Sequence, residues 1–320
     1  MKKYMPVFMV LFVLIALVCG VFWHNRGVQA VNIKVNVRDL PEHGLLIIGP
    51  SEPSFDGHVS ALLKGKANPV VEALKPFSVF IKNIGRNAVV AYQLRWEMVR
   101  ADGTVVTREM GGSNPRALMD GGAPGLEYLS TTSGYAIRPG STRFVSPVMA
   151  LDEDQTGNLG AYAGGSSDQN DIPQLQQAMR DKNLAPMFDT IARELYGYKS
   201  MTVSVDGAFF EDGTFVGPDN THFFTQVKAE IDAKRDLLNE IAFARNHNRN
   251  QKDIFSDVEA WANNPGNNIT PNATSTDYYN YYKSVYADEV LHMRKAMGED
   301  KAIALALQPL RKQWCKLEKR

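Results

Sequence analysis

Five tyrosines between residues 278 and 286 form the densest group of chemically distinctive side chains in the sequence. Tyr278, Tyr282 and Tyr286 are spaced four residues apart, so all three lie on one face if the segment is helical. Aromatic residues at this spacing usually pack against a neighbouring helix or sheet. If the face is exposed, however, it predicts a surface for protein binding or glycan stacking, because tyrosine is enriched at interfaces.

Acidic and amide side chains cluster in Asp152-Glu153-Asp154-Gln155-Thr156-Gly157-Asn158. The cluster begins like a calcium-binding loop, with oxygen-bearing side chains at alternate positions and a glycine at the sixth. The twelfth position of such a loop needs a bidentate acid, but here it is Ala163, which excludes an EF-hand. A looser calcium site using Asp152 and Asp154 stays open beside the simpler interpretation of an acidic surface loop. No other metal or cofactor is expected.

Motifs of the common enzyme classes are missing from the sequence. It contains no nucleophile elbow, zincin helix or phosphate-binding loop. Glu289 and His292 have the spacing used by di-metal helix bundles, but the second such pair and the two further glutamates are lacking. Paired carboxylates can perform acid–base chemistry without a motif. A hydrolase using one of the acids at 152–154 together with Asp212 is therefore the alternative to a non-enzymatic protein.

The first thirty residues predict export or membrane anchoring. Lys2 and Lys3 precede an apolar stretch over residues 5–23, and Val28-Gln29-Ala30 offers a cleavage site with small residues. The apolar stretch is long for a signal peptide and just long enough to span a bilayer as a helix. Residues 1–30 are thus either a cleaved signal peptide or, as we slightly favour, a membrane anchor. In both cases the rest of the chain is expected to work outside the cytoplasm, either membrane-anchored or free in the periplasm or medium.

Charge and cysteine content narrow the class of partner. The sequence has 35 basic and 35 acidic residues, so it offers no broad phosphate-binding surface and nucleic acid is not an expected partner. Its two cysteines, Cys19 and Cys315, cannot form a structural disulfide, because Cys19 lies inside the apolar N-terminal stretch. A fold without disulfides fits a bacterial envelope protein better than a small secreted animal domain.

Alternating apolar and polar residues predict a β-rich domain over residues 31–218. The clearest stretch runs from Phe77 to Glu109, where Asn/Gly and Asp/Gly turns separate three antiparallel strands. Further strands are expected over residues 31–37, 142–149 and 201–205. A sheet with one apolar face needs a second sheet to cover it, which predicts an antiparallel β-sandwich. Two short helical patterns predict a helical insertion at about 172–197, before the last strand.

Beyond residue 218 the pattern becomes helical. Apolar residues at three- and four-residue spacing predict helices over about 222–245, 254–261 and 277–297, the last of them capped by Ser275 or Thr276. The same spacing from Ile303 to Leu317 predicts a final helix that is kinked at Pro309 and ends in basic residues. Residues 219–320 are therefore expected to form a helical hairpin or small bundle, and the fold class is α+β.

Two stretches of the sequence resemble envelope proteins. The stretch Phe80-Ile81-Lys82-Asn83, followed by Val90-Ala91-Tyr92 and Asp102-Gly103, resembles immunoglobulin-like sandwich domains of bacterial envelope proteins. The stretch from Asp206 to Asp219 resembles uncharacterised exported proteins of soil bacteria. The resemblance covers about residues 31–245, implies an extracytoplasmic immunoglobulin-like sandwich and carries over no catalytic residue. We therefore expect a non-enzymatic interaction or assembly module of the cell envelope, with a protein partner.

Overall fold

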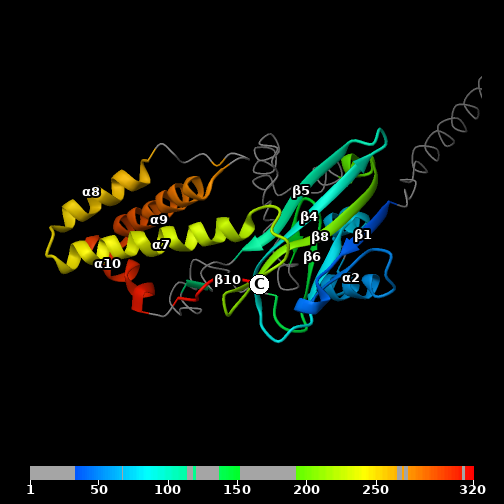
Figure 1. The fold of residues 1–320 in the computed structure, drawn as a ribbon, viewed down its shortest axis with the longest axis horizontal. Coiled ribbons are helices and arrows are strands. Elements are labelled where there is room, and N and C mark those ends of the chain that lie inside the picture. Colours follow the sequence, from blue (N-terminus) through cyan, green and yellow to red (C-terminus); the bar gives the residue numbers. More distant parts are fainter. Residues whose placement is uncertain are drawn as a thin grey trace, which may run out of the picture.

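The computed structural model describes residues 33–66, 68–113, 118–119, 137–151, 192–264, 269, 273–311 and 314–320. The chain forms a two-sheet region, built mainly from residues 33–216, and a helical arm over residues 223–311 that extends from it (Figure 1). The predicted α+β class is thus confirmed. The predicted N-terminal segment lies outside the described residues, as does most of the predicted insertion at 172–197. No helix in the described part of the chain is long and apolar enough to cross a bilayer.

The larger sheet is mixed rather than antiparallel. In the described residues its strands are β1 (Lys34–Arg38), β4 (Val89–Arg100), β5 (Val105–Ser113), β8 (Tyr198–Phe210), β9 (Thr214–Val216) and β10 (Glu318–Lys319). They follow the order β10-β9-β8-β4-β5, and β1 pairs with β8. Because β1 runs parallel to β8 and β10 runs parallel to β9, the prediction of a purely antiparallel sandwich is wrong. Parallel pairs join segments far apart in the chain, so alternation along one strand cannot reveal them.

The smaller sheet shares a hydrophobic core with the larger one. Its strands are β2 (Leu45–Ile48), β3 (Val79–Asn83), β6 (Thr142–Val145) and β7 (Ala150–Leu151), and all its pairs are antiparallel. Ile81 of this sheet is fully buried in the same core as Trp96 and Val203 of the larger sheet. The predicted three-strand unit is therefore divided, because β3 belongs to the smaller sheet while β4 and β5 form a hairpin in the larger one.

Two short helices cover part of this core. They are α2 (Phe55–Leu63) and α3 (Pro69–Leu74). Phe55 of α2 packs edge-on against Phe80 of β3, with 5.3 Å between the ring centroids. Neither helix, nor strand β2, is predicted from the sequence, because short apolar runs show no period that separates helix from strand.

The helical arm largely follows the sequence prediction. Its described α-helices are α7 (Phe223–Asn246), α8 (Gln251–Ala262), α9 (Ser275–Met297) and α10 (Glu299–Ala306). Helix α9 packs against the other three helices. Its cap is Thr274 rather than Ser275 or Thr276: the Thr274 hydroxyl accepts from the backbone N–H of Asp277, whose carboxylate accepts from the Thr274 N–H in return.

The predicted final helix ends early. Helix α10 stops at Ala306, a 3-10 turn follows at Gln308–Arg311, and residues 314–320 return to the two-sheet region, where Glu318–Lys319 form β10. The prediction of a helix through Leu317 is therefore wrong. Trp314 and Leu317 pack against the core of the arm without being helical. The spacing of the apolar residues therefore showed that they are buried but not that they form a helix. Cys315 is partly buried, and this burial raises the pKa of its thiol.

A second hydrophobic core joins the arm to the larger sheet. Phe209 of β8 and Phe215 of β9 belong to this core, together with Phe223 at the start of α7. Beside them, an irregularity in the pairing of β4 and β8 leaves Asp206 without an opposite residue, as in a β-bulge. The Asp206 carboxylate is fully buried and accepts hydrogen bonds from Asn220 and Thr221, just before α7. The arm is thus fixed to the sheet by both apolar and polar contacts.

Candidate functional site

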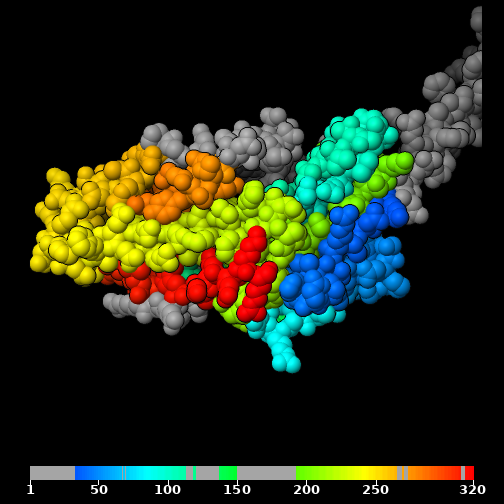
Figure 2. Space-filling view, viewed as in Figure 1, coloured from blue at the N-terminus to red at the C-terminus, as the bar shows by residue number. Residues whose placement is uncertain are grey.

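A groove of about 420 Å³ lies where several turns of the two-sheet region meet. Four segments line it: residues 42–44, the β3–β4 turn at 85–87, the β8–β9 hairpin at 210–216, and Arg320. We call it the basal groove. Figure 2 shows the C-terminal residues, in red, lying on the surface beside the blue residues of the first strands. The groove therefore brings together the two extremes of the described chain.

The turn that carries Arg86 and Asn87 is held rigidly by a buried asparagine. The side-chain nitrogen of Asn83 donates to the carbonyl oxygens of Asn87 and Ile137, each at 2.8 Å, and its Oδ1 accepts from the N–H of Gly85 at 2.9 Å. Gly85 also touches the backbone of Gly44, where a Cβ would lie only 2.8 Å from the Gly85 Cα. Position 44 also has a positive φ of 79°, so both the close contact and the backbone conformation favour glycine there.

Of the two acidic side chains in the groove, Asp212 is held by hydrogen bonds, whereas Glu42 is exposed. Asp212 accepts from the Asn87 side-chain nitrogen at Oδ2 and from the backbone N–H of Thr214 at Oδ1, each at 2.9 Å. Glu42 lies 3.8 Å from the ring nitrogen Nε2 of His43. Asp212 is the acid named in the hydrolase hypothesis, whereas its expected partners at 152–154 lie outside the described residues. The expected calcium ligands Asp152 and Asp154 likewise lie outside the described residues.

The cationic side chains of the groove are not engaged in this way. The backbone N–H of Arg320 donates to Phe215 at 3.0 Å, and that of Glu318 donates to Gly213 at 3.1 Å, which fixes the tail on β9. The guanidinium groups of Arg86 and Arg320 are exposed and make no ion pair with any described residue. Between these charges Phe210 and Val216 are buried and supply an apolar floor.

The predicted tyrosine face of α9 is directed toward α7. Tyr282 accepts from the Gln226 side-chain nitrogen at 3.0 Å, and Tyr286 donates to Glu230 Oε1 at 2.7 Å. Tyr278 is partly exposed. Burial raises the pKa of Tyr282, and the charge of Glu230 raises it further. The hydroxyls thus stabilise the contact between the two helices, and a binding role for this face stays a prediction.

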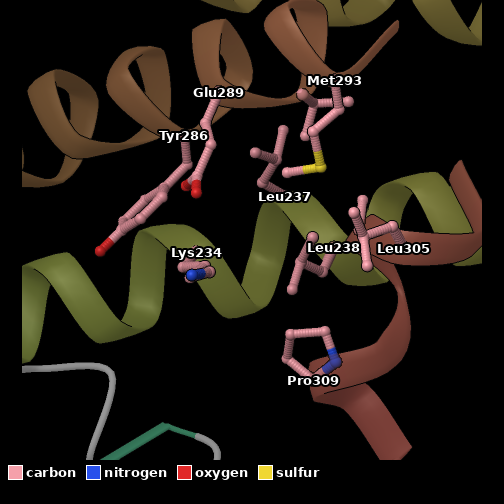
Figure 3. A pocket seen from close by; sticks show the side chains of 10 residues that line it. Lys234, Leu237, Leu238, Tyr286, Glu289, Met293, Leu305 and Pro309 are labelled. Carbon is pink, nitrogen blue, oxygen red and sulfur yellow. The ribbon is translucent and has the colours of Figure 1, made fainter. Parts of the chain in front are cut away.

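A small pocket lies beside Tyr286 between α7, α9 and α10. Figure 3 shows Lys234 and Glu289 near the Tyr286 end, and Leu238, Met293, Leu305 and Pro309 toward the other. The Lys234 nitrogen lies 4.6 Å from the Tyr286 ring centroid, close enough for a cation–π contact. The interior volume of about 20 Å³ suits one water molecule rather than a ligand.

The potential metal ligands of the arm do not converge. Glu289 lines the small pocket, whereas His292 is exposed and its Nδ1 lies 3.3 Å from Asp288 on the same helix. Among the described residues, no group of three or more histidine, cysteine or acidic side chains is placed to hold a metal ion.

A half-buried acid, Glu109, lies on β5 near the start of α9. The Gln93 side-chain nitrogen donates to Glu109 Oε2 at 3.3 Å, and an added Cβ at Gly111 would lie 2.3 Å from Gln93 Oε1. Burial raises the pKa of Glu109, and the charge of Asp206 raises it further. The folded protein therefore holds the Glu109 proton more tightly than the unfolded chain does.

Replacing Glu109 by glutamine is expected to raise the melting temperature at about pH 7 and to change it little near pH 4. Because the folded-state pKa is raised, the ionised carboxylate destabilises the fold. This cost is absent below the unfolded-state pKa and grows as the pH rises through the folded-state pKa. Since the side chain is half exposed, solvent limits the effect to at most about 1 kcal/mol. Thermal unfolding of both proteins across this pH range is the measurement. A change in melting temperature that does not depend on pH would contradict the prediction.

Sequence reasoning located one groove residue, Asp212, and missed Glu42, Arg86 and Arg320. These three come from separate segments of the chain. Only the segment from Asn83 to Asn87 carried a recognisable signal, and that signal predicted a turn rather than a site. The chain matches no protein-family model, no curated protein and no solved structure.

Proposed function

We propose that this protein is a non-enzymatic interaction module of the bacterial cell envelope and that the basal groove holds a segment of a protein partner. The groove itself carries the proposal. Its volume of about 420 Å³ falls in the range of binding sites, and exposed charges surround the buried Phe210 and Val216. An apolar centre within a polar rim is the usual composition of a protein interface.

The position of the groove supports a binding role. Turns at the end of packed sheets are free to vary while the sheets hold them in place, and many proteins bind their ligands there.

We further propose that the two sheets form an immunoglobulin-like sandwich. Strand β1 begins at Lys34, shortly after the expected cleavage site at Ala30. A signal peptide or anchor over residues 1–30 would place the whole two-sheet region outside the cytoplasm.

A hydrolase is the second candidate, because Glu42 and Asp212 line the same groove. Two carboxyl groups in one cleft can act as general acid and base. Both oxygens of Asp212 already accept hydrogen bonds that hold its turn, however, which favours binding over catalysis. Hydrolysis by the purified protein that is abolished in the variants Glu42→Gln and Asp212→Asn, while both remain folded, would support the enzyme instead.

Site-specific photo-cross-linking in the cells that make the protein tests the binding role. A photoreactive amino acid at position 86 lies in the groove, and the same amino acid at position 252 lies on an exposed part of α8 as a matched control. We expect a discrete cross-linked protein from position 86 and none of that size from position 252. Identical products from both positions, or no product from position 86, would contradict a partner in the groove.

A further inference from the structure

We infer that residues 318–320 form a strap that holds the base of the helical arm against the larger sheet and that opens while the rest of the fold stays intact. When the strap opens, the first turn of α7 loosens with it. The inference concerns the joint between arm and sheet and does not depend on what the basal groove binds. It follows from one ion pair between the strap and the residues that precede α7.

The strap is attached to the sheet by few contacts. The backbone N–H of Glu318 donates to the carbonyl oxygen of Gly213 at 3.1 Å. That of Arg320 donates to the carbonyl oxygen of Phe215 at 3.0 Å. All three strap residues are exposed, whereas the preceding Leu317 packs against the second hydrophobic core. The strap can therefore leave the edge of the sheet without taking apolar side chains out of the core, which is typical of a locally opening segment.

One side chain of the strap reaches the joint. The Lys319 nitrogen donates to Asp219 Oδ2 at 2.9 Å, and the Asp219 side chain is only 6% exposed. The other oxygen, Oδ1, accepts from the backbone N–H of Phe224 at 2.9 Å. This N–H belongs to the first turn of α7, where the backbone donors have no partner within the helix. Among the described residues, Lys319 is the one cation within ion-pair distance of this carboxylate.

The backbone at Asp219 also depends on the contacts around it. Its φ is +59°, a left-handed conformation that is unfavourable for a residue with a side chain, so its surroundings must hold it there. Its N–H donates to the carbonyl oxygen of Asp206 at 2.8 Å, in the bulge of β8. The residue therefore connects the sheet, the strap and the first turn of α7.

Opening of the strap changes the electrostatics of the joint. Without Lys319, the Asp219 carboxylate is left buried and without an opposite charge, which is costly. The carboxylate is relieved by turning toward water, and it then gives up the N–H of Phe224. Strap opening and loosening of the first turn of α7 thus favour each other, and the coupling is reciprocal. The apolar contacts of Phe209 keep the arm attached meanwhile.

Hydrogen exchange of the full-length protein in neutral detergent, read by mass spectrometry, tests the inference. Lys319→Met keeps most of the side chain but removes its charge. We expect residues 220–227 to exchange about three- to tenfold faster in this variant, the effect of losing one charge-assisted contact. Strands β4 and β8 should exchange as before. Lys316→Met is the matched control, because Lys316 is exposed in the same C-terminal segment and makes no ion pair with a described residue. It should leave residues 220–227 unchanged.

Asp219→Asn shows whether the charge of Lys319 acts through this carboxylate. Asparagine removes the acid and tolerates a left-handed backbone. In this background, Lys319→Met should speed the exchange of residues 220–227 by less than about twofold, because its partner is already gone. An equal effect of Lys319→Met with and without Asp219 would overturn the inference. So would unchanged exchange at α7 in Lys319→Met, since residues 318–320 would then be a passive tail. Equally accelerated exchange of β4 and β8 would also overturn it, because the whole fold would then be opening.

Discussion

Replacing Phe209 by alanine is expected to lower the free energy of unfolding by about 3–5 kcal/mol. Phe209 is fully buried where the arm meets the larger sheet. Its ring centroid lies 4.8 Å from that of Phe215, 5.9 Å from Phe223 and 5.6 Å from Phe224. The substitution removes the hydrophobic contact and leaves a cavity that three fixed rings cannot easily fill.

Urea denaturation followed by circular dichroism measures this loss. Phe243→Ala is the matched control, because Phe243 lies on the same arm but is 63% exposed. The control should change the free energy of unfolding by no more than about 0.5 kcal/mol. If the two substitutions lower the free energy of unfolding equally, Phe209 does not stabilise the contact between the arm and the larger sheet.

Replacing Asp206 by alanine is expected to cost about 3–4 kcal/mol. The buried carboxylate accepts four hydrogen bonds of 2.6–3.0 Å from the backbone and side chains of Asn220 and Thr221. Alanine would leave these donors without their acceptor in a place where water has little access. The close contact there permits little rearrangement, because a Cβ at Gly217 would lie 2.6 Å from the Asp206 carbonyl oxygen.

The variant Asp206→Asn separates shape from charge. It keeps one oxygen but replaces the other by an amide that faces N–H or O–H donors, so we expect about half the loss seen with alanine. Asp288→Ala, at an exposed position of α9, should cost less than about 1 kcal/mol. Hydrogen exchange should show faster opening of the first turn of α7 in both Asp206 variants. Equal stability of Asp206→Ala and Asp288→Ala would show that the carboxylate does not fasten the arm.

Local periodicity was enough to identify the long elements. Strands β4 and β5 keep alternation over many residues with an Asp-Gly turn between them, and α7 and α9 keep a helical period over several turns. These signals depend only on which face of an element is buried, and each element carries that information in its own residues. The α+β class follows from their order along the chain.

Pairing between distant segments was decided by tertiary structure. Alternation in β3 and β4 is equally compatible with one sheet or two, and it gives no sign that β1 lies parallel to β8. The spacing from Ile303 to Leu317 predicted a helix, yet the chain beyond Ala306 leaves the helical path and its last residues pair with β9. Apolar residues must be buried in either conformation, so their spacing alone did not select one.

The basal groove is likewise formed only by the tertiary structure. Its walls come from four segments, and no single segment shows a motif. Arg86 and Asp212 are ordinary turn residues in the sequence, and only the fold shows that they line one groove and that Asp212 accepts a hydrogen bond from Asn87. A sequence lists charges, but only the fold decides which of them neutralise each other, because electrostatic interaction depends on distance in space.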